Sequence, residues 1–416
     1  VYTKHLKKGR YRYIVSQRCW GGELVKVSIK NVGCLSDSTI ECEGLTVICG
    51  INGTGKSTIL KSIYSTLCPA MYFDTFRDYQ IRDTLATLGY RHLDDSVRRN
   101  IRVLKSDDDY LEILNKLDTA VGEDEQDREP LEFVRTLLER SDEGDKKFYE
   151  AVVRTRIDTE FDDVDQFRTI GTRNIASVKI TGGPSATLKV TSKGNIKFEG
   201  DRKKILSTVY WDSPFNADDV RRYVDVYGDH RRDLGYLLHG QFNRNIILSS
   251  AYETNLQKFD DAVESIVRGR LVNTKQGLRY ESENGNLLSV KNVAAGIKVF
   301  ATIRMLVDKG VLYEGSVLML DEPESHLHPQ WINVLGDVIA ILARDLRIKV
   351  ILTTHNPQLL MAVESSVGDF RKKVRYYNIR AGEDGKSVIE DVGDRISLIY
   401  DEMSGPIQDV ASRFWE

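Results

Sequence analysis

The stretch CGINGTGKSTIL, from Cys49 to Leu60, is the segment that most constrains how this chain can fold. It fits the pattern G-x-x-x-x-G-K-[ST], with Gly50, Gly55, Lys56 and Ser57 at the fixed positions. An apolar run precedes it and an apolar-periodic stretch follows it, so we expect a strand, a glycine-rich turn and a helix in that order. Such a turn wraps backbone N–H groups around phosphate oxygens, and the helix N-terminus adds partial positive charge.

The turn predicts a site for ATP and Mg²⁺. Lys56 is expected to reach the β- and γ-phosphates, and Ser57 is expected to ligate the metal ion. A purely structural turn is the alternative, but it would give the lysine no role. The residues that we expect to hold ATP here are Asn52, Gly53, Thr54, Gly55, Lys56, Ser57 and Thr58.

A second motif, SVLMLDEPESHLHP, lies far along the chain and begins at Ser316. Its apolar residues predict a strand that ends at Asp321 and Glu322. Asp321 is then placed to hold Mg²⁺ through water, and Glu322 is placed to polarise the attacking water. Taken alone, the motif could also be a strand that ends in a charged turn.

A third motif, VILTTHNPQLL, places His355 at the end of another apolar strand. A histidine beside the phosphate-binding turn can contact the γ-phosphate of a bound nucleotide. We therefore expect three catalytic residues, Lys56, Glu322 and His355, and two metal-holding residues, Ser57 and Asp321.

The rest of the chain predicts an α/β fold with insertions. The strand–helix–strand order near the C-terminus implies a parallel sheet. Ser177 to Gly200 alternates with period two and predicts two or three antiparallel strands. Dense charge with helical periodicity predicts a helical insertion. The helix after the glycine-rich turn is expected to end near Leu67, before Pro69. Four segments are expected: residues 1–73 and 287–416 as the two parts of a nucleotide-binding head, 74–175 as the helical insertion, and 176–286 as a β-hairpin and helical part.

Composition excludes several classes of protein. The net charge of −3 and a pI near 6.3 do not suggest a dedicated nucleic-acid binder. No apolar run approaches the roughly 18 residues of a transmembrane helix. The five cysteines are odd in number and form no CxxC pair, which indicates reduced thiols in the cytoplasm.

The three motifs, in this order, resemble the ABC-type ATPase heads of the RecF/SMC and OLD-like group, whose DEPExHLHP run is close to DEPESHLHP. The resemblance covers about residues 24–67 and 287–377. It implies a P-loop head with a mixed sheet, an antiparallel β subdomain and a helical insertion. It also implies that two heads dimerise and enclose ATP between one P-loop and the partner's signature segment.

The signature segment departs from the LSGGQ-like pattern of that group. Alignment on the second glycine places Gly296 of VAAGIK at the nucleotide, and Ala294 at the position of the serine that contacts the γ-phosphate. This departure puts fast hydrolysis in doubt, but not nucleotide binding. Three glutamines remain open as the Q-loop residue: Gln80, Gln166 and Gln241.

Within the group, the AAGIK segment, the C-terminal stretch beginning YYNIRAGEDGK and the helical insertion are similar to ATPases of bacterial anti-phage operons. The PtuA family of Septu systems is the first candidate, and the AriA family of PARIS systems is the second. This resemblance implies a cytoplasmic homo-oligomer and an effector such as an HNH nuclease, with nucleic acid contacted through that partner and no membrane.

Two alternatives stay open, a RecF/SMC-like DNA-repair ATPase and a nucleotide-sensing scaffold with negligible hydrolysis. A DNA-repair ATPase would need a basic groove, and the acidic pI and insertion count against one. Glu324 and His326 are expected at a dimer interface, and a zinc site at His326 and His328 is disfavoured because residues two apart do not share a face.

Overall fold

The computed structural model describes residues 24–93, 101, 104, 106–122, 125–183, 185–200, 207–218, 228–240 and 250–415. The chain divides into two compact units. The described part of the smaller unit comprises residues 72–155, and that of the larger unit comprises residues 24–71 and 156–415. Residues 156–175, which we had expected in the helical insertion, therefore belong to the larger unit.

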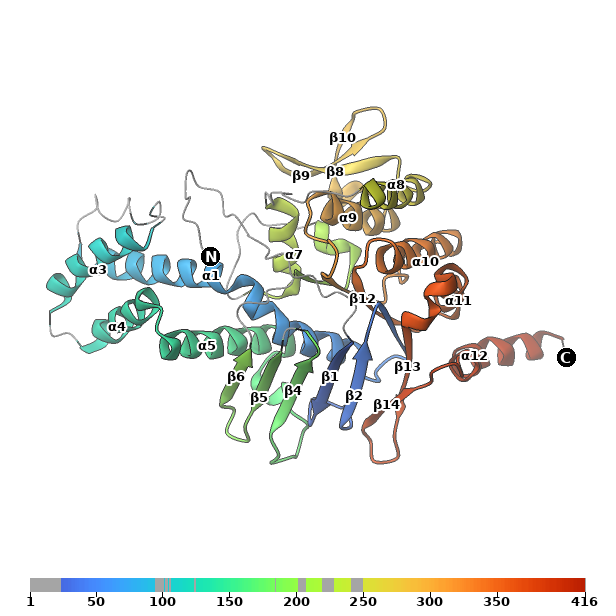
Figure 1. Ribbon diagram of the computed structural model, residues 1–416, viewed down its shortest axis with the longest axis horizontal. Helices are drawn as coiled ribbons and strands as arrows, with labels where there is room; N and C mark the ends of the chain where they lie inside the picture. The colour runs from blue at the N-terminus through green and yellow to red at the C-terminus, as the bar shows by residue number, and fades with distance from the viewer. Residues whose placement is uncertain are drawn as a thin grey trace. The chain divides into compact units, whose positions relative to one another are not determined.

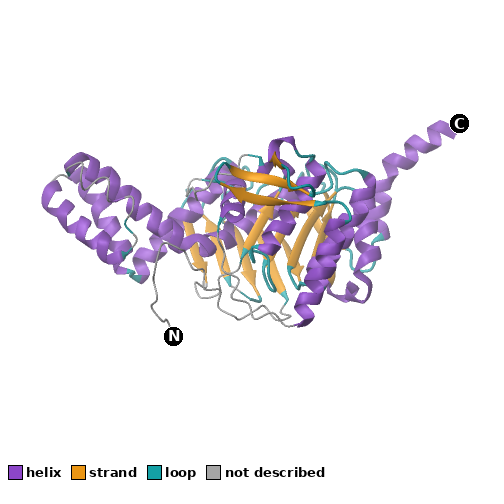
Figure 2. Ribbon diagram, turned by 90° about the horizontal axis from the view of Figure 1, so that it is seen from above, coloured by secondary structure: helices purple, strands orange, loops and turns teal. Residues whose placement is uncertain are grey.

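A six-stranded sheet forms the core of the larger unit, in the order β14-β13-β3-β12-β11-β7. Its strands run parallel except β14, which pairs antiparallel with β13 at one edge. All residues of β3, β11 and β12 are buried, as expected for a parallel sheet that is covered on both faces (Figure 2). The strands are β3 (Leu45–Cys49), β7 (Thr208–Trp211), β11 (Val317–Asp321), β12 (Lys349–Thr354), β13 (Val374–Ala381) and β14 (Ser387–Asp391).

Helices α10 and α11 follow the strands that carry the second and third motifs. Each begins with a proline at its first position, and the preceding residue, His328 or Asn356, accepts a hydrogen bond from a backbone N–H of the first turn. The helices of this part are α7 (His230–His239), α8 (Ser250–Glu264), α9 (Ala295–Asp308), α10 (Pro329–Arg344), α11 (Pro357–Val367) and α12 (Ser397–Trp415).

An antiparallel sheet in the order β2-β1-β4-β5-β6 forms a second layer of the larger unit (Figure 1). Three antiparallel strands arise from the stretch that the sequence predicted, and they extend the β1–β2 hairpin instead of standing alone. A separate ribbon of β8, β9 and β10 precedes α9 (Figure 1). The strands are β1 (Val25–Lys30), β2 (Ser38–Cys42), β4 (Ala176–Thr181), β5 (Ala186–Val190), β6 (Ile196–Gly200), β8 (Gly269–Thr274), β9 (Gly277–Ser282) and β10 (Leu287–Ser289).

Helix α1 (Lys56–His92) begins at the glycine-rich turn, as predicted, but it does not end near Leu67. The expectation was wrong because Pro69 lies inside the helix. Proline removes one backbone hydrogen bond and costs a helix interior about 3 kcal/mol. Leu67, Cys68 and Met71 are all buried around it, so packing of the surrounding turns outweighs the local penalty.

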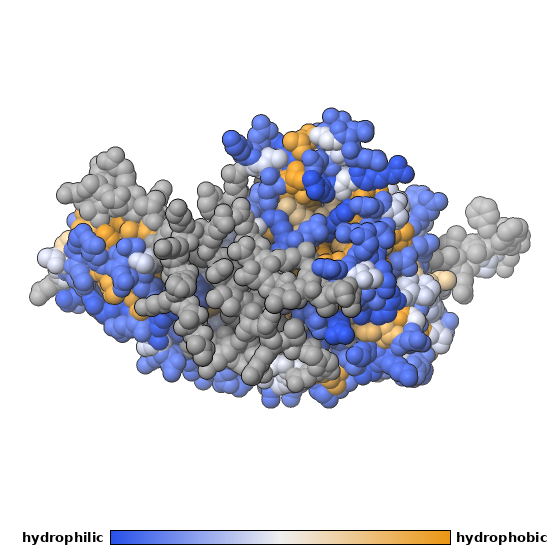
Figure 3. Space-filling model, turned by 45° about the horizontal axis from the view of Figure 1, so that its top comes forward, coloured by the Kyte–Doolittle hydropathy of each residue, from blue (hydrophilic) through white to orange (hydrophobic). Residues whose placement is uncertain are grey.

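The smaller unit is helical, as the periodicity predicted for that part of the chain. Its core includes Phe73, whose ring stacks on Tyr149 with centroids 4.2 Å apart, and the buried Arg77, which donates to the carbonyl oxygen of Leu137. On the face shown in Figure 3, hydrophilic residues predominate over the described surface. None of the described helices is long and apolar enough to cross a membrane. The remaining helices are α3 (Asp107–Val121), α4 (Glu125–Glu139), α5 (Asp142–Phe161) and α6 (Val164–Phe167), the last of which lies in the larger unit.

Candidate functional site

The glycine-rich turn connects β3 to α1 and leaves no room for a side chain at two of its three glycines, Gly50 and Gly55. Gly55 has φ of +91°, and a Cβ there would lie 2.8 Å from the Sγ of Cys34. A Cβ on Gly50 would lie 2.3 Å from the carbonyl oxygen of Ile379. The backbone conformation and the close neighbours therefore both require glycine.

The side chain of Lys56 turns back into this loop. Its Nζ donates to the carbonyl oxygens of Gly50 at 2.8 Å and Ile51 at 3.0 Å, and it lies 3.1 Å from Oε1 of Glu322. The lysine is only 4% exposed, so its charge is fixed at the turn. This placement is the one that a phosphate-binding lysine needs.

The other residues of the turn differ in what they offer to a ligand. Asn52, Gly53 and Ser57 are exposed, and Thr58 is half-buried. Thr54 is buried, and its hydroxyl donates to the carbonyl oxygen of Ile51 at 2.9 Å. Thr54 would thus contact a phosphate through its backbone N–H alone, whereas Ser57 has an exposed side chain.

Asp321 is the last residue of β11 and is held by hydroxyl groups from both neighbouring strands. Tyr210 of β7 donates to its Oδ2 at 2.9 Å, and Thr353 of β12 donates to its Oδ1. Burial and the nearby Asp321 carboxylate raise the pKa of Tyr210 well above its ordinary value, so the phenol stays a donor. The two hydroxyls orient the Asp321 carboxylate without bringing a positive charge to it.

Glu322 follows directly and adopts a backbone conformation that is unusual for a glutamate, with φ of +47°. Its backbone N–H donates to the carbonyl oxygen of Thr353 at 3.1 Å. Its Oε1 lies 3.1 Å from Nζ of Lys56 and 3.1 Å from Nδ1 of His355. The structure thus brings together the three residues that we expected to be catalytic, although they come from three separate segments of the chain.

Lys56 and Glu322 border a cavity of about 540 Å³, which is in the size range of small-molecule sites. His355 contacts Glu322 but is not among the residues that line the cavity. The donor groups fit the expected ligands, because the turn presents N–H groups and a lysine to phosphates, and Ser57 and Asp321 offer the oxygen atoms that Mg²⁺ prefers. Five lining residues were not singled out as ligand contacts from the sequence. The cavity is lined by Cys34, Asn52, Gly53, Gly55, Lys56, Ser57, Thr58, Asp212, Pro214, Asp321, Glu322, Ser325 and His326.

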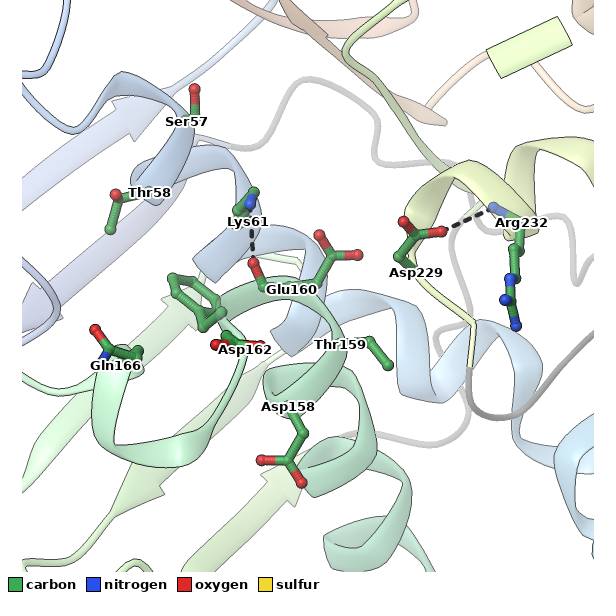
Figure 4. Close-up of a pocket in the computed structure, with 11 residues that line it drawn as sticks. Ser57, Thr58, Lys61, Asp158, Thr159, Glu160, Asp162, Gln166, Asp229 and Arg232 are labelled. Atoms are coloured by element: carbon green, nitrogen blue, oxygen red, sulfur yellow. Dashed lines mark hydrogen bonds between the residues drawn. The ribbon is translucent and has the colours of Figure 1, made fainter. Parts of the chain in front are cut away.

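A second cavity, of about 770 Å³, also borders Ser57 and Thr58 and is shown in Figure 4. Its lining includes Gln166, one of the three glutamines left open by the sequence. Gln80 instead bonds to Thr84 within α1, and Gln241 lies outside the described residues. Of the two described glutamines, only Gln166 lies beside the phosphate-binding turn.

Gly296 does not line either cavity. It is buried in the first turn of α9, where a Cβ would lie 2.4 Å from Cζ3 of Trp331 on α10. Packing between α9 and α10 therefore already requires glycine at this position. A contact between Gly296 and the nucleotide of a second chain stays a prediction.

Three polar residues within the second motif have local roles. Glu324 is 3% exposed and accepts a hydrogen bond from Thr354, and burial raises its pKa to about 7. Its side chain is buried within the chain itself, contrary to its expected place at an interface. His326 is exposed and packs its ring against the edge of Phe215, and His328 caps α10.

In the larger unit, a mostly parallel six-stranded sheet is combined with an antiparallel five-stranded sheet, and the glycine-rich turn joins β3 to α1. Solved structures with a similar fold include the SMC head domain from Thermotoga maritima (11% identity, covering 89% of this chain and 98% of that chain, TM-score 0.39). Another is the Smc head domain with an extended coiled coil bound to the C-terminal domain of ScpA from Pyrococcus furiosus (10% identity, covering 90% of this chain and 98% of that chain, TM-score 0.42). A third is the recombination mediator protein RecF (11% identity, covering 89% of this chain and 99% of that chain, TM-score 0.41).

No curated protein matches the chain. One protein family matches residues 45–362, and its description is "AAA domain, putative AbiEii toxin, Type IV TA system". The matched region is well over half of the chain and runs from β3 into α11, so it contains all three motifs and the residues that meet around Lys56. The chain therefore belongs to this AAA domain family of ATPases.

Proposed function

We propose that this protein binds ATP with Mg²⁺ and slowly transfers the γ-phosphoryl group to water. One observation carries the proposal: Lys56 and Glu322 line a single cavity together with Ser57 and Asp321, and His355 contacts Glu322. A glycine-rich turn alone would support phosphate binding only. The carboxylate and the imidazole opposite the lysine add groups that can act on water and on the terminal phosphate.

Each residue then has a separate part in the reaction. Lys56 places its charge on the β- and γ-phosphate oxygens as the bond between the γ-phosphorus and the bridging oxygen breaks. Glu322 orients the attacking water and accepts its proton. His355, whose side chain is 41% exposed, contacts the γ-phosphate. Ser57 and Asp321 would hold Mg²⁺, which supplies charge neutralisation when it is bound.

The biological output that we propose is ATP-controlled assembly of two heads, which scaffolds or regulates an effector nuclease in anti-phage defence. Two observations support the assembly: Ala294 at the start of α9 is exposed, and no side chain caps the helix. The free backbone N–H groups of that turn suit a phosphate on a second copy. The family description names a toxin of a toxin–antitoxin system, which agrees with a defence role.

A second candidate is a scaffold that senses ATP and hardly hydrolyses it. Ala294 favours this candidate, because it lacks the hydroxyl that a serine would offer to the γ-phosphate. The two candidates share the binding site and differ only in turnover.

Phosphate release by the wild type and by Glu322→Gln, together with ATP binding, tests the proposal. Loss of the carboxylate is expected to lower turnover about 10²- to 10³-fold and to leave ATP binding intact. Glu390→Gln is the control, because Glu390 pairs with Arg380 and Arg395 and does not line the cavity.

Each outcome of this experiment decides a different point. Turnover that does not change in Glu322→Gln would show that the assigned base is wrong. Tight ATP binding with negligible turnover in the wild type would select the scaffold. Absence of ATP binding in the wild type would overturn both candidates.

A further inference from the structure

The residue that follows β7 brings another carboxylate to the nucleotide cavity. In the parallel pairing of β7 with β11, Trp211 lies opposite Leu320, so the next residues along the two strands are Asp212 and Asp321. Asp212 lines the same cavity as Lys56 and Ser57. An aspartate therefore stands at the end of β11 and directly after β7, at the phosphate-binding edge of the sheet.

Three side chains from the segment after β7 contact Asp212. Asn216 donates to its Oδ1 at 2.7 Å, Arg231 donates to its Oδ2 at 2.7 Å, and Nε2 of His230 lies 3.1 Å from the same Oδ2. Burial alone would raise the pKa of Asp212, but these contacts hold it well below its usual range. The carboxylate is thus ionised and fixed in direction.

His230 is the buried member of this set, with 3% exposure. Its Nδ1 lies 2.8 Å from Oε2 of Glu160, and its backbone N–H donates to Oε1 of Glu160 at 2.7 Å. Its ring stacks on Tyr210 with centroids 4.1 Å apart, and Tyr210 donates to Asp321. One imidazole therefore contacts Asp212 directly and supports the tyrosine that orients Asp321.

Glu160 in turn is anchored to the helix that begins at the phosphate-binding turn. Nζ of Lys61 on α1 donates to the backbone carbonyl of Glu160 at 2.8 Å (Figure 4). Figure 4 also shows Glu160 lying between Lys61 and the first turn of α7, where Asp229 caps the backbone N–H of Arg232. The position of His230 is therefore set by α1, α5, α7 and β7 together.

We propose that Asp212 is a further residue of the nucleotide site, where its carboxylate accepts a hydrogen bond from a water molecule on the ATP-bound Mg²⁺. His230 is the positioning residue that holds the Asp212 carboxylate beside that of Asp321. This inference rests on the proposed function. Mg²⁺ usually keeps several waters in a nucleotide site, and the protons of those waters need acceptors. The cations on Asp212 compensate its charge, which suits an oriented acceptor better than a direct ligand.

The affinity of a fluorescent ATP analogue, measured with Mg²⁺ and again with EDTA, tests this inference. Asp212→Asn keeps the shape of the side chain and removes its charge. It is expected to weaken binding about 10- to 100-fold with Mg²⁺, as changes around metal ligands do. With EDTA the affinity should stay the same or rise, because a negative charge near the phosphates has been removed.

His230→Gln is expected to change the Mg²⁺ dependence of the affinity in the same direction as Asp212→Asn. Combining the two variants should add little, because both break the same contact between His230 and Asp212. Glu43→Gln is the matched control. Glu43 also pairs with a cation, Arg375, but it lies at the N-terminal end of β3, away from the cavity.

Equal weakening of Asp212→Asn with and without Mg²⁺, or no weakening at all, would overturn the inference and leave Asp212 a structural residue. Melting temperatures measured on the same samples show whether a variant is folded. Failure of the wild type to bind the analogue in both buffers would instead contradict the proposed function, so the two failures are distinguishable.

Discussion

Asp321 and Asp212 end two adjacent parallel strands, and the protein holds them in opposite ways. Among the residues that the structure describes, Asp321 accepts hydrogen bonds from two neutral hydroxyl groups, those of Tyr210 and Thr353. Asp212 is surrounded by His230 and Arg231, which carry positive charge. A hydroxyl orients a carboxylate and leaves its charge available to a cation, whereas a cation partly cancels that charge. Asp321 is therefore suited to binding a metal ion, and Asp212 is suited to orienting the groups around that ion.

The largest effect is expected from removing the negative charge of Asp321, which its hydroxyl donors do not neutralise. Asp321→Asn should lower ATP turnover about 10³-fold or more, because it removes an interaction with the metal ion that strengthens in the transition state. Phosphate release at saturating Mg²⁺ measures this, with the melting temperature as a check on folding. A loss smaller than that of Asp212→Asn would reverse the roles that we assign to the two aspartates.

The contacts of His230 with Asp212 and Glu160 predict that the free energy of unfolding depends on pH. Burial alone would lower the pKa of His230, but Asp212 and Glu160 raise it to about 9, above the ordinary 6.5. A raised histidine pKa stabilises the folded state fully below pH 6.5, and this stabilisation is lost as the pH rises through 9. The shift corresponds to about 3 kcal/mol.

Chemical denaturation of the wild type and His230→Gln between pH 6 and pH 9.5 tests this. The difference in the free energy of unfolding should be largest near pH 6 and should shrink toward pH 9.5. Glu160, Asp212, Tyr210 and Tyr64 lie against the imidazole and are the same in both proteins, so the difference isolates the histidine. A difference that does not change with pH would contradict a charged His230.

The smallest effect is expected from removing one of the two hydroxyls on Asp321. Tyr210→Phe keeps the ring on His230, and it should cost about 2 kcal/mol of stability and about tenfold in turnover, since one hydrogen bond from a hydroxyl to a carboxylate is lost. Tyr377→Phe is the control, because its hydroxyl bonds to the backbone of Glu41 instead of a cavity residue. Similar turnover in the two variants would show that the hydroxyl does not orient Asp321.

The sequence predicted the role of Asp321 at the site but missed that of Asp212, for a physical reason. An apolar run that ends in Asp321 and Glu322 is a local pattern, and parallel pairing brings such strand ends together. Asp212 also follows a buried strand, but its role depends on contacts that link Glu160 to a histidine 70 residues later. No spacing in the sequence indicates that contact.

Two other departures have the same cause. Helix α1 continues through Pro69 because the residues around the proline are buried. Glu324 is buried within the chain because it accepts a hydrogen bond from Thr354 at the end of β12. In both cases packing between distant segments outweighed the local pattern. The strands that carry the three motifs and the phosphate-binding turn could be predicted because each is encoded in one short stretch.

The most direct test of the central claim is the affinity of a fluorescent ATP analogue for the wild type and for Lys56→Ala in the presence of Mg²⁺. Lys116→Ala, a change in an exposed lysine of α3, serves as the control. We predict that the wild type and the control bind alike and that Lys56→Ala binds about 100-fold more weakly while remaining folded, because a charge-assisted phosphate contact is lost. Equal affinity of all three proteins would contradict nucleotide binding at this turn.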